Sequence, residues 1–365
     1  MKSILITGGP VHAHLDAVKV ITNRFKGGLM SDLAEKLASY DTRIVYLCAP
    51  QVGAVVPKDK FANIEIVRHT GFDDYRHQIQ KLAPEMDAVI LGAAVANLLP
   101  VSPWTGKFPS HNYKAGDIIP IDFTIAPRVI DEVKKVAPKT QLFGYKLLSG
   151  VPHEELIRAA YGIVLESKAT AVIANDAKNL LQKYAVTKER GVHPLAQEEL
   201  PGWLWDMMND TYYTSVVLPD IGVLVSDASR FQSLIQKYAK HFTHTESGLV
   251  FGTVAMRLPL GFLTTGRGKR EVDSMTVVTH VDHEHHRVYV GNAVKASLNA
   301  PLLSRLLERE CVDHIVHYHE QVTGLPTYPY APPGTVRDTE RNSSTSFNIA
   351  GHGCMLLFDK EGRQL

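Results

Sequence analysis

The sequence has few cysteines, no excess of charge of either sign and no long apolar run. Its three cysteines, Cys48, Cys311 and Cys354, form neither a C-x-x-C pair nor a disulfide framework, which favours a reducing, cytoplasmic location. The 39 basic and 38 acidic residues nearly cancel, so no overall field attracts nucleic acid or an anionic membrane. No apolar run reaches about 18 residues and the first residues lack the pattern of a signal peptide, so we expect neither membrane spanning nor secretion.

Two well-known phosphate-binding signatures are also missing from the glycine-rich start of the chain. An apolar run, Ile4–Thr7, leads into Gly8-Gly9-Pro10, and a glycine pair follows at 27–28. The spacing of these glycines fits neither G-x-G-x-x-G nor G-x-x-x-x-G-K-[ST], which excludes the standard dinucleotide and P-loop sites. Glycines that end a strand ahead of a helix nevertheless expose backbone N–H groups, so we predict a phosphate site of another kind.

What the chain does have is length and a regular alternation of apolar runs with amphipathic stretches. Its 365 residues favour two domains. In the first half the alternation predicts an α/β domain, with a parallel sheet covered on both faces and a ligand crevice at the carboxyl ends of its strands. The expected strands are Ile4–Thr7, Thr42–Leu47, Asn63–Val67, Ala88–Gly92, Gln141–Lys146 and Ala171–Ala174, and the expected helices are Ser31–Ser39, Asp73–Leu82, Ala126–Val136 and His153–Ser167.

Turn signals place the domain boundary after residue 214. A hairpin around the turn 188–191 closes the first domain, 1–214, and the stretch 215–222 is expected as a linker because it contains Leu218-Pro219-Asp220-Ile221-Gly222. The second domain, 223–365, mixes helices with alternating strands. Its expected helices are Ala228–Phe242 and Ala300–Arg309, and its expected strands are Leu249–Leu258, Gly261–Thr265, Met275–His280, His286–Gly291 and an apolar run that ends in His317-Tyr318-His319.

Five motifs in the first half follow one another as in phosphopantothenate–cysteine ligase. They are Gly8-Gly9-Pro10 and the stretches 16–24, 92–96, 144–147 and 174–176. The resemblance implies a Rossmann-like fold and the joining of 4′-phosphopantothenate to cysteine in coenzyme A biosynthesis, driven by CTP or ATP with Mg²⁺. In such a ligase the acid becomes an acyl nucleotidylate, pyrophosphate leaves, and the amine then attacks.

The resemblance also implies roles for individual residues. Asn23 would lie at the reacting acyl group, where its amide donates to the charged oxygen, and Lys107 and Lys114 would close over the phosphates from the 103–117 loop. By residue type alone, Asn23 also fits a helix cap, and the two lysines also fit solvated loop charges. The residues implied to bind nucleotide or substrate are Gly8, Gly9, Pro10, Asp16, Arg24, Ala93, Ala94, Ala96, Asn97, Tyr145, Lys146, Asn175 and Asp176.

The chain departs from that family in the zones that bind acid and nucleotide. Asn97 stands where the family has an aspartate, the stretch 25–28 replaces Ser-Ser-Gly-Lys, and Leu148-Ser149 replaces Glu-Thr. The identities of the acid, the amine and the nucleotide therefore stay open.

Three histidines in the second half have the spacing of a metal site. His317 and His319 are two apart on an expected strand and so share a face, and His352 lies between two glycines before another apolar run. Three neutral imidazoles with an open position are typical of catalytic Zn²⁺, although a His-x-His pair on a strand edge also occurs as a structural feature. The other histidine cluster, at 280–286, contains interleaved acidic residues and is expected to be a solvated turn.

The second half resembles the class II aldolase and adducin family through the stretches 316–319, 351–353, 264–268 and 325–335. This resemblance implies an α/β/α fold and Zn²⁺, or a similar divalent ion, held by the three histidines in a tetramer. Asn299 stands where aldolases carry a glutamate, and an amide cannot act as a general base, so ordinary retro-aldol cleavage is disfavoured.

The two resemblances together predict a bifunctional, homo-oligomeric enzyme: an acid–amine ligase that dimerises through its first half, fused to a metal-binding aldolase-like domain. Its expected partners are a carboxylic acid, which can be phosphorylated, and an amine such as cysteine. One alternative is a lyase, dehydratase or epimerase in the second half, with a first half that only binds. Another is a catalytically degenerate scaffold.

Overall fold

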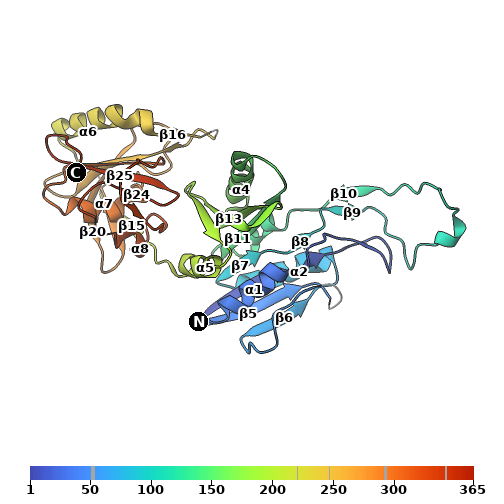
Figure 1. The fold of residues 1–365 in the computed structure, drawn as a ribbon. Coiled ribbons are helices and arrows are strands. Elements are labelled where there is room, and N and C mark those ends of the chain that lie inside the picture. Colours follow the sequence, from blue (N-terminus) through green and yellow to red (C-terminus); the bar gives the residue numbers. More distant parts are fainter. Residues whose placement is uncertain (51–53, 220, 246, 292–293, 342) are drawn as a thin grey trace. The chain divides into compact units, whose positions relative to one another are not determined.

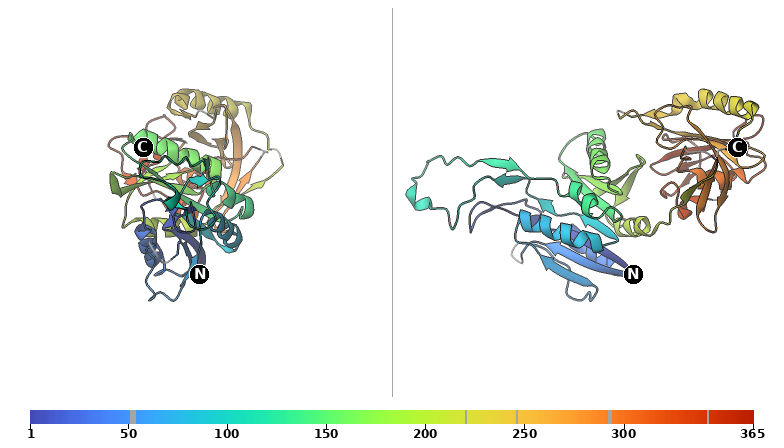
Figure 2. Two further views of the ribbon diagram at one scale, coloured as in Figure 1. Left: turned by 90° about the vertical axis from the view of Figure 1, so that its right-hand side faces the viewer. Right: turned by 180° about the vertical axis from the view of Figure 1, so that it is seen from behind.

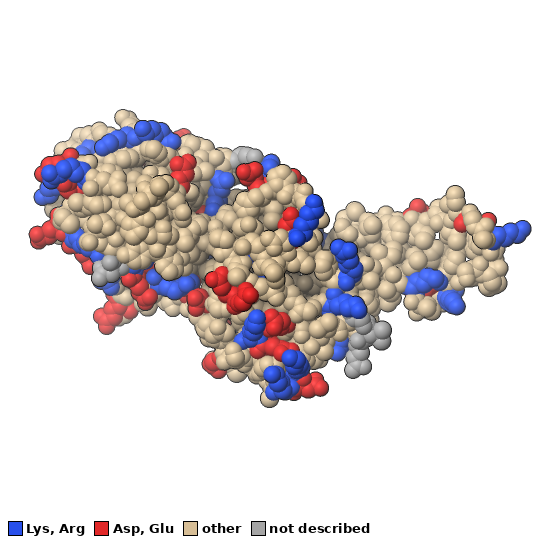
Figure 3. Space-filling model, viewed as in Figure 1, with Lys and Arg blue, Asp and Glu red and all other residues tan. Residues whose placement is uncertain are grey.

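The computed structural model describes residues 1–50, 54–219, 221–245, 247–291, 294–341 and 343–365 (Figure 1). The chain divides into two compact units, Met1–Met208 and Asn209–Leu365. In the described ranges, no helix is both long and apolar enough to cross a membrane. On the face drawn in Figure 3, basic and acidic side chains are interspersed, in keeping with the balanced composition.

The first unit is built on an eight-stranded sheet in the order β14-β13-β12-β11-β7-β1-β5-β6. The six strands from β12 to β6 in this order are parallel, and β13 and β14 add an antiparallel hairpin at one edge. The structure therefore confirms the six predicted parallel strands. Their bounds are β1 Lys2–Gly8, β5 Thr42–Cys48, β6 Ile64–Arg68, β7 Ala88–Leu91, β11 Gln141–Leu148, β12 Ala171–Asp176, β13 Asn179–Thr187 and β14 Val192–Ala196.

Helices cover both faces of this sheet. Leu5 and Val89 face a buried cluster that includes α2, α3 and α4, whereas Met30 of α1 lies against Gly8 and Gly92 on the other face. The strands are apolar on both faces because both are covered. The helices are α1 Gly28–Leu37, α2 Phe72–Leu82, α3 Ile130–Val136, α4 His153–Ser167 and α5 Leu200–Asn209, with short 3₁₀ turns η1 Ala83–Glu85 and η2 Ser110–Asn112.

The strand order reverses between β1 and β7. The chain runs from β1 outward through β5 and β6, then returns to β7 on the opposite side of β1. Such a switch point leaves a crevice at the carboxyl ends of the two strands, where ligands of α/β sheets bind. Beyond these ends the two segments pair again as β2 (Pro10–Val11) and β8 (Ala94–Val95), and β3 (Ala13–His14) pairs with β4 (Val20–Ile21).

A long arm extends from the body of the first unit (Figures 1 and 2). Its base is an antiparallel pair, β9 (Leu98–Pro100) with β10 (Phe123–Ile125), and the η2 turn lies in the connection between them. The predicted phosphate-closing loop, 103–117, is part of this arm.

The second unit is built on a nine-stranded mixed sheet in the order β15-β21-β20-β19-β18-β22-β25-β24-β23. A small pair, β16 with β17, lies outside it. The bounds are β15 Thr214–Val217, β16 Thr243–His244, β17 Val250–Phe251, β18 Thr253–Arg257, β19 Phe262–Thr265, β20 Met275–Asp282, β21 Arg287–Val290, β22 His314–Tyr318, β23 Thr327–Tyr328, β24 Phe347–Ile349 and β25 Gly353–Phe358; the helices are α6 Val225–Tyr238, α7 Ala300–Leu307 and α8 Val336–Thr339, with the 3₁₀ turn η3 Ala239–His241.

The expected linker 215–222 differs from what is observed. Residues Thr214–Val217 form β15, which pairs in parallel with β21 and so belongs to the second unit, and Asp220 lies outside the described residues. Residues 214–217 pair with β21, a partner some 70 positions later that local turn signals cannot indicate.

The two faces of the second sheet have different surroundings. Val316 and Tyr318 of β22 pack into an apolar cluster with α6, so the residue between them, His317, points to the opposite face. Thr253, its partner across the ladder, hydrogen-bonds with Ser297 just before α7. Helices thus lie on both faces, and the α7 face carries buried polar side chains.

Candidate functional site

Two glycine turns meet at the switch point of the first unit. Gly9 and Gly27 both adopt the left-handed backbone region, with φ of 77° and 92°. A Cβ atom on Gly27 would lie 2.4 Å from the backbone nitrogen of Gly9, so no larger residue fits there without moving one turn. The close approach places the start of α1 directly beside the end of β1.

In the first turn of α1, the backbone N–H groups of residues 28–30 have no backbone partner among the described residues. Gly27 is the N-cap residue and supplies no side-chain cap, and a Cβ on Gly28 would meet open space. The first N–H groups of a helix lack partners within the helix and carry its positive dipole end, which favours an anion. The predicted phosphate site therefore has suitable donors and room beside it.

The opposite wall of the crevice is made of small residues after β7. Ala94 N donates to Gly9 O at 2.9 Å, and Ala96 N donates to Val11 O at 3.2 Å. Ala93 N donates to Thr7 Oγ1 at 3.2 Å. The structure thus brings the stretches 8–10 and 93–96 together at the carboxyl ends of β1 and β7.

Asn23 lies at the edge of the same crevice. Its Nδ2 donates to Val95 O at 2.9 Å, and its side chain is exposed. Asn23 is not a helix cap, because α1 begins at Gly28 with Gly27 as its N-cap residue. Arg24 is exposed beside it, with its guanidinium over the ring of Phe25.

Asp16 holds the base of the arm. Its carboxylate is buried and accepts from Phe108 N at 2.9 Å and from Val18 N at 2.7 Å, and it also pairs with Lys19 Nζ. The backbone N–H of Phe108, followed by those of Lys19 and Val18, holds the pKa of this carboxyl far below its usual range. With both oxygens engaged, Asp16 is a positioning residue for the arm.

The two predicted phosphate-closing lysines are on the arm beyond this anchor. Lys107 and Lys114 are exposed, and in the described part of the chain no hydrogen bond joins either side chain to the glycine crevice. A run of aromatic rings stiffens the arm: the ring of Phe108 lies 4.8 Å from that of Trp104 and 5.3 Å from that of Tyr113.

The remaining predicted residues lie along β11, β12 and the stem of the arm. Asp176 accepts from Lys178 N and Gly150 N, which lowers its pKa, and so fixes the turn after β12. Tyr145 has a buried hydroxyl whose pKa is raised by burial. Lys146 and Leu147 pair with Ala174 and Asn175 in the ladder of β11 with β12, and the carbonyl of the exposed Asn97 accepts from Ala126 N.

In the second unit the three predicted histidines converge. His317 lies on β22, His319 directly follows that strand, and His352 lies in the turn before β25. One nitrogen of each lies within 4.8 Å of the other two, and the ring centroids are 4.7 to 5.2 Å apart. Two ligand nitrogens in a tetrahedral zinc site are about 3.4 Å apart, so small side-chain movements would close the set around an ion.

The orientation of His317 suits metal binding. Its Nδ1 lies 2.8 Å from Cys354 O, and because a carbonyl only accepts, Nδ1 carries the proton. Its Nε2 is then a bare acceptor that is buried with no hydrogen-bond partner among the described residues. Burial lowers the pKa of His317 to about 4, which keeps the imidazole neutral. A ligand histidine needs this state, with its second nitrogen held by a carbonyl.

Asn299 lies on the same face. Thr253 Oγ1 and Ser297 Oγ are 3.0 Å apart, and Asn299 N donates to Ser297 Oγ at 3.3 Å. The side-chain oxygen of Asn299 is buried and has no hydrogen-bond partner within the described ranges. This amide oxygen can accept a hydrogen bond, but it cannot act as a base.

A lysine is also buried in this unit. Lys269 Nζ donates to Gly252 O, immediately before Thr253, and burial lowers the pKa of Lys269 to about 8.

The expectation of a solvated turn at 280–286 is wrong for His283. This side chain is half-buried, and its Nδ1 lies 2.7 Å from Tyr213 Oη. Interleaved acids indicated exposure, but Tyr213 is 70 positions away and gave no local signal.

Comparisons with known proteins bear on the first unit. The family described as DNA/pantothenate metabolism flavoprotein C-terminal domain matches residues 1–198, more than half of the chain. The coenzyme A biosynthesis bifunctional protein CoaBC of Thermococcus kodakarensis is 25% identical over 182 residues, which is 48% of this chain and 42% of that protein. The chain thus spans less than half of that relative's length.

Solved structures agree on the fold of the first unit. The DNA/pantothenate metabolism flavoprotein of Streptococcus pneumoniae matches with a TM-score of 0.50 and 23% identity, over 56% of this chain and 97% of that one. L-fuculose-1-phosphate aldolase of Thermus thermophilus matches over 37% of this chain and 85% of that one, at 12% identity. Its TM-score of 0.27 is too low to assign a fold. Through residues 1–198, the chain belongs to the DNA/pantothenate metabolism flavoprotein C-terminal domain family.

Proposed function

We propose that the first unit is a nucleotide-dependent acid–amine ligase that joins a carboxylic acid such as 4′-phosphopantothenate to an amine such as cysteine. The observation that carries the proposal is the crevice at the switch point, where the turns of Gly9 and Gly27 meet the start of α1. Family membership and the name of the Thermococcus relative support it.

The chemistry needs a better leaving group than a carboxylate oxygen. A carboxylate oxygen of the acid attacks the α-phosphorus of CTP or ATP, and the bond to pyrophosphate breaks. The amine nitrogen then forms a bond to the acyl carbon, the nucleoside monophosphate leaves, and the amine loses a proton to solvent. When bound, Mg²⁺ neutralises charge on the phosphates.

The residues of this chain would act on the charges that these steps create. The N–H groups at the start of α1 hold a phosphate, and the small wall at 93–96 lets the nucleotide approach the backbone. Asn23 can turn its amide from Val95 O to the acyl oxygen as negative charge develops there. The arm anchored by Asp16 would bring Lys107 and Lys114 to the phosphates.

The direct test is product formation by the purified full chain. The protein is mixed with 4′-phosphopantothenate, cysteine, Mg²⁺ and either CTP or ATP, and pyrophosphate release and the mass of the product are measured. We expect both signals with one nucleotide, and no pyrophosphate when the acid is left out. If neither nucleotide gives product but one of them binds in calorimetry, the first unit binds nucleotide and acts on an acid other than 4′-phosphopantothenate.

We further propose that the second unit holds a divalent metal such as Zn²⁺ through His317, His319 and His352. The close approach of their nitrogens and the bare, buried Nε2 of His317 support this. When bound, such an ion polarises a carbonyl or hydroxyl oxygen of a substrate. With an amide at Asn299, the activity that fits is a dehydratase, an epimerase or a lyase with another base.

The metal proposal is tested by elemental analysis of the full chain after purification without added metal. We expect about one equivalent of a divalent metal per chain, and a chelator should remove it. Bound metal without turnover on hydroxy acids or sugar phosphates would favour the scaffold alternative for this unit.

A further inference from the structure

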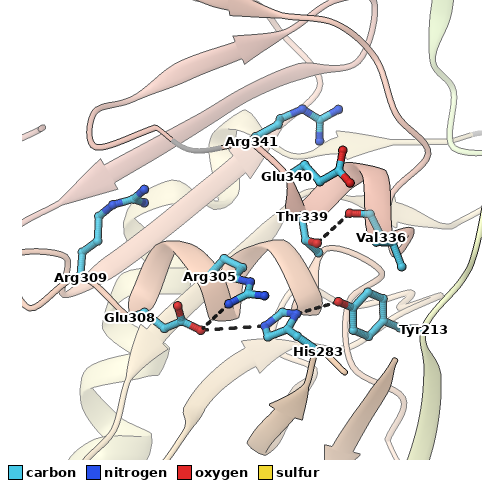
Figure 4. Close-up of a pocket in the computed structure, with 9 residues that line it drawn as sticks. All are labelled: Tyr213, His283, Arg305, Glu308, Arg309, Val336, Thr339, Glu340 and Arg341. Carbon is cyan, nitrogen blue, oxygen red and sulfur yellow. Dashed lines mark hydrogen bonds and ion pairs between the residues drawn. The ribbon is translucent and has the colours of Figure 1, made fainter. Parts of the chain in front are cut away.

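The second unit contains a cavity of about 570 Å³ that neither proposed activity uses (Figure 4). None of the three metal-site histidines lines it. Cavities of roughly 300–1,000 Å³ are the size that holds small metabolites. Its lining residues are Tyr213, His283, Arg305, Glu308, Arg309, Val336, Thr339, Glu340 and Arg341.

One side of the cavity is a tyrosine–histidine pair. Tyr213 precedes β15, His283 lies in the turn after β20, and their rings meet edge to face with centroids 5.5 Å apart. The hydrogen bond between Tyr213 Oη and His283 Nδ1 fixes the imidazole. Its Nε2 has no hydrogen-bond partner among the described residues and lies 4.0 Å from Glu308 Oε1. The Nε2 atom of His283 is therefore available to hydrogen-bond with a ligand in the cavity.

Arg305 supplies positive charge and N–H donors to the cavity. Its guanidinium comes from α7 and reaches toward His283 (Figure 4). Among the described residues Arg305 has one ion-pair partner, Glu308, whose Oε1 is 3.6 Å away, beyond ordinary hydrogen-bond length. A guanidinium has five N–H donors in a planar fork that matches a carboxylate or a phosphate. The Arg305 side chain is 45% exposed and can therefore be reached from solvent.

The opposite side of the cavity is rigid. Arg341 is buried, where it pairs with Asp338 and donates to Pro329 O at 3.0 Å. Asp338 N in turn donates to Thr335 Oγ1, the cap of α8. Arg341 is thus committed to the fold, so among these two arginines Arg305 is the one available to a ligand.

We propose that this cavity binds a small organic anion, whose phosphate or carboxylate group pairs with Arg305 while the Tyr213–His283 pair hydrogen-bonds to a neighbouring hydroxyl or carbonyl group. The acidic side chains of the lining, Glu308 and Glu340, favour a ligand that carries hydroxyl or amine donors as well as the anion.

Calorimetry on the full chain tests this with two probes, glycerol 3-phosphate for the phosphate class and glycerate for the carboxylate class. Ionic strength is held constant with NaCl, because screening alone changes weak anion binding. We expect saturable binding of one probe. Arg305→Ala should weaken it by roughly tenfold or more, since a charged hydrogen-bonding partner is lost, and Tyr213→Phe should weaken it by a smaller factor.

The matched control is Arg363→Ala, which also removes an exposed arginine paired with acids but lies outside the lining. Binding should be unchanged in this variant. If Arg305→Ala fails to fold, Arg305→Gln and the ¹⁵N shift of His283 on probe addition replace it. Saturable binding of neither probe, or equal weakening by Arg305→Ala and Arg363→Ala, overturns the proposal.

Discussion

Replacing Gly27 with alanine should destabilise the first unit and abolish nucleotide binding. The new Cβ would lie 2.4 Å from Gly9 N and 2.7 Å from Gly9 Cα, both backbone atoms that cannot rotate away. Left-handed backbone costs a non-glycine residue roughly 1–2 kcal/mol, and overpacking costs about 1–3 kcal/mol. The free energy of unfolding should therefore fall by about 2–5 kcal/mol.

The neighbouring glycine provides a matched control. A Cβ on Gly28 meets nothing within 4 Å, and Gly28 is the first residue of α1. Alanine there is a better helix former by up to about 1 kcal/mol, so Gly28→Ala should be neutral or slightly stabilising.

Denaturant unfolding of both variants, followed by calorimetry with CTP and ATP in the presence of Mg²⁺, measures the two effects. Gly27→Ala should show the loss of stability and no heat of binding even at temperatures where it is folded. Equal stability of the two variants would refute the close contact between the turns. Wild-type affinity in a folded Gly27→Ala variant would refute the placement of the phosphate at this crevice.

Three further predictions concern single side chains. Asn23→Ala should slow amide formation by two to three orders of magnitude, since losing one oxyanion donor raises the barrier by about 2.7–4 kcal/mol. The control Thr22→Ala should keep the wild-type rate. Equal rates in the two variants would show that Asn23 takes no part in the reaction. His317→Ala should lose the bound metal, measured by elemental analysis, whereas the exposed His244→Ala keeps it; retained metal in the first variant would contradict the site. Burial lowers the pKa of Lys269 to about 8, below about 10.4 in the unfolded chain, so the folded state binds fewer protons between these values. The free energy of unfolding should then rise between about pH 8 and pH 10, by on the order of 3 kcal/mol, and Lys269→Met should flatten that rise in pH-dependent denaturation; an unchanged slope would show that Lys269 is not the source.

The sequence predicted the architecture of the first unit because its signals are local. Six apolar runs, each followed by a glycine or an amphipathic stretch, correspond to the six parallel strands. The contact of Gly27 with Gly9 was not predicted, because the two glycines are 18 positions apart and β2, β3 and β4 lie between them.

What the sequence did not predict depends on contacts between distant residues. Asp16 was assigned to ligand binding, but its role follows from Phe108, which lies 92 positions later. The cavity residues Tyr213 and His283 are 70 positions apart, and neither a periodic pattern nor a motif links them. The spacing of His317 and His319 was informative because two positions along a strand share a face.

The metal site has a consequence for how the protein unfolds. Its three imidazoles come from the end of β22 and from the turn that leads into the adjacent β25, so a bound ion would join two neighbouring strands of the second sheet. A metal at a hundred times its dissociation constant would add about 2.7 kcal/mol to the stability of that unit alone. On heating, the metal-loaded protein should then unfold in two transitions, and the midpoint temperature of the later one should rise with metal concentration.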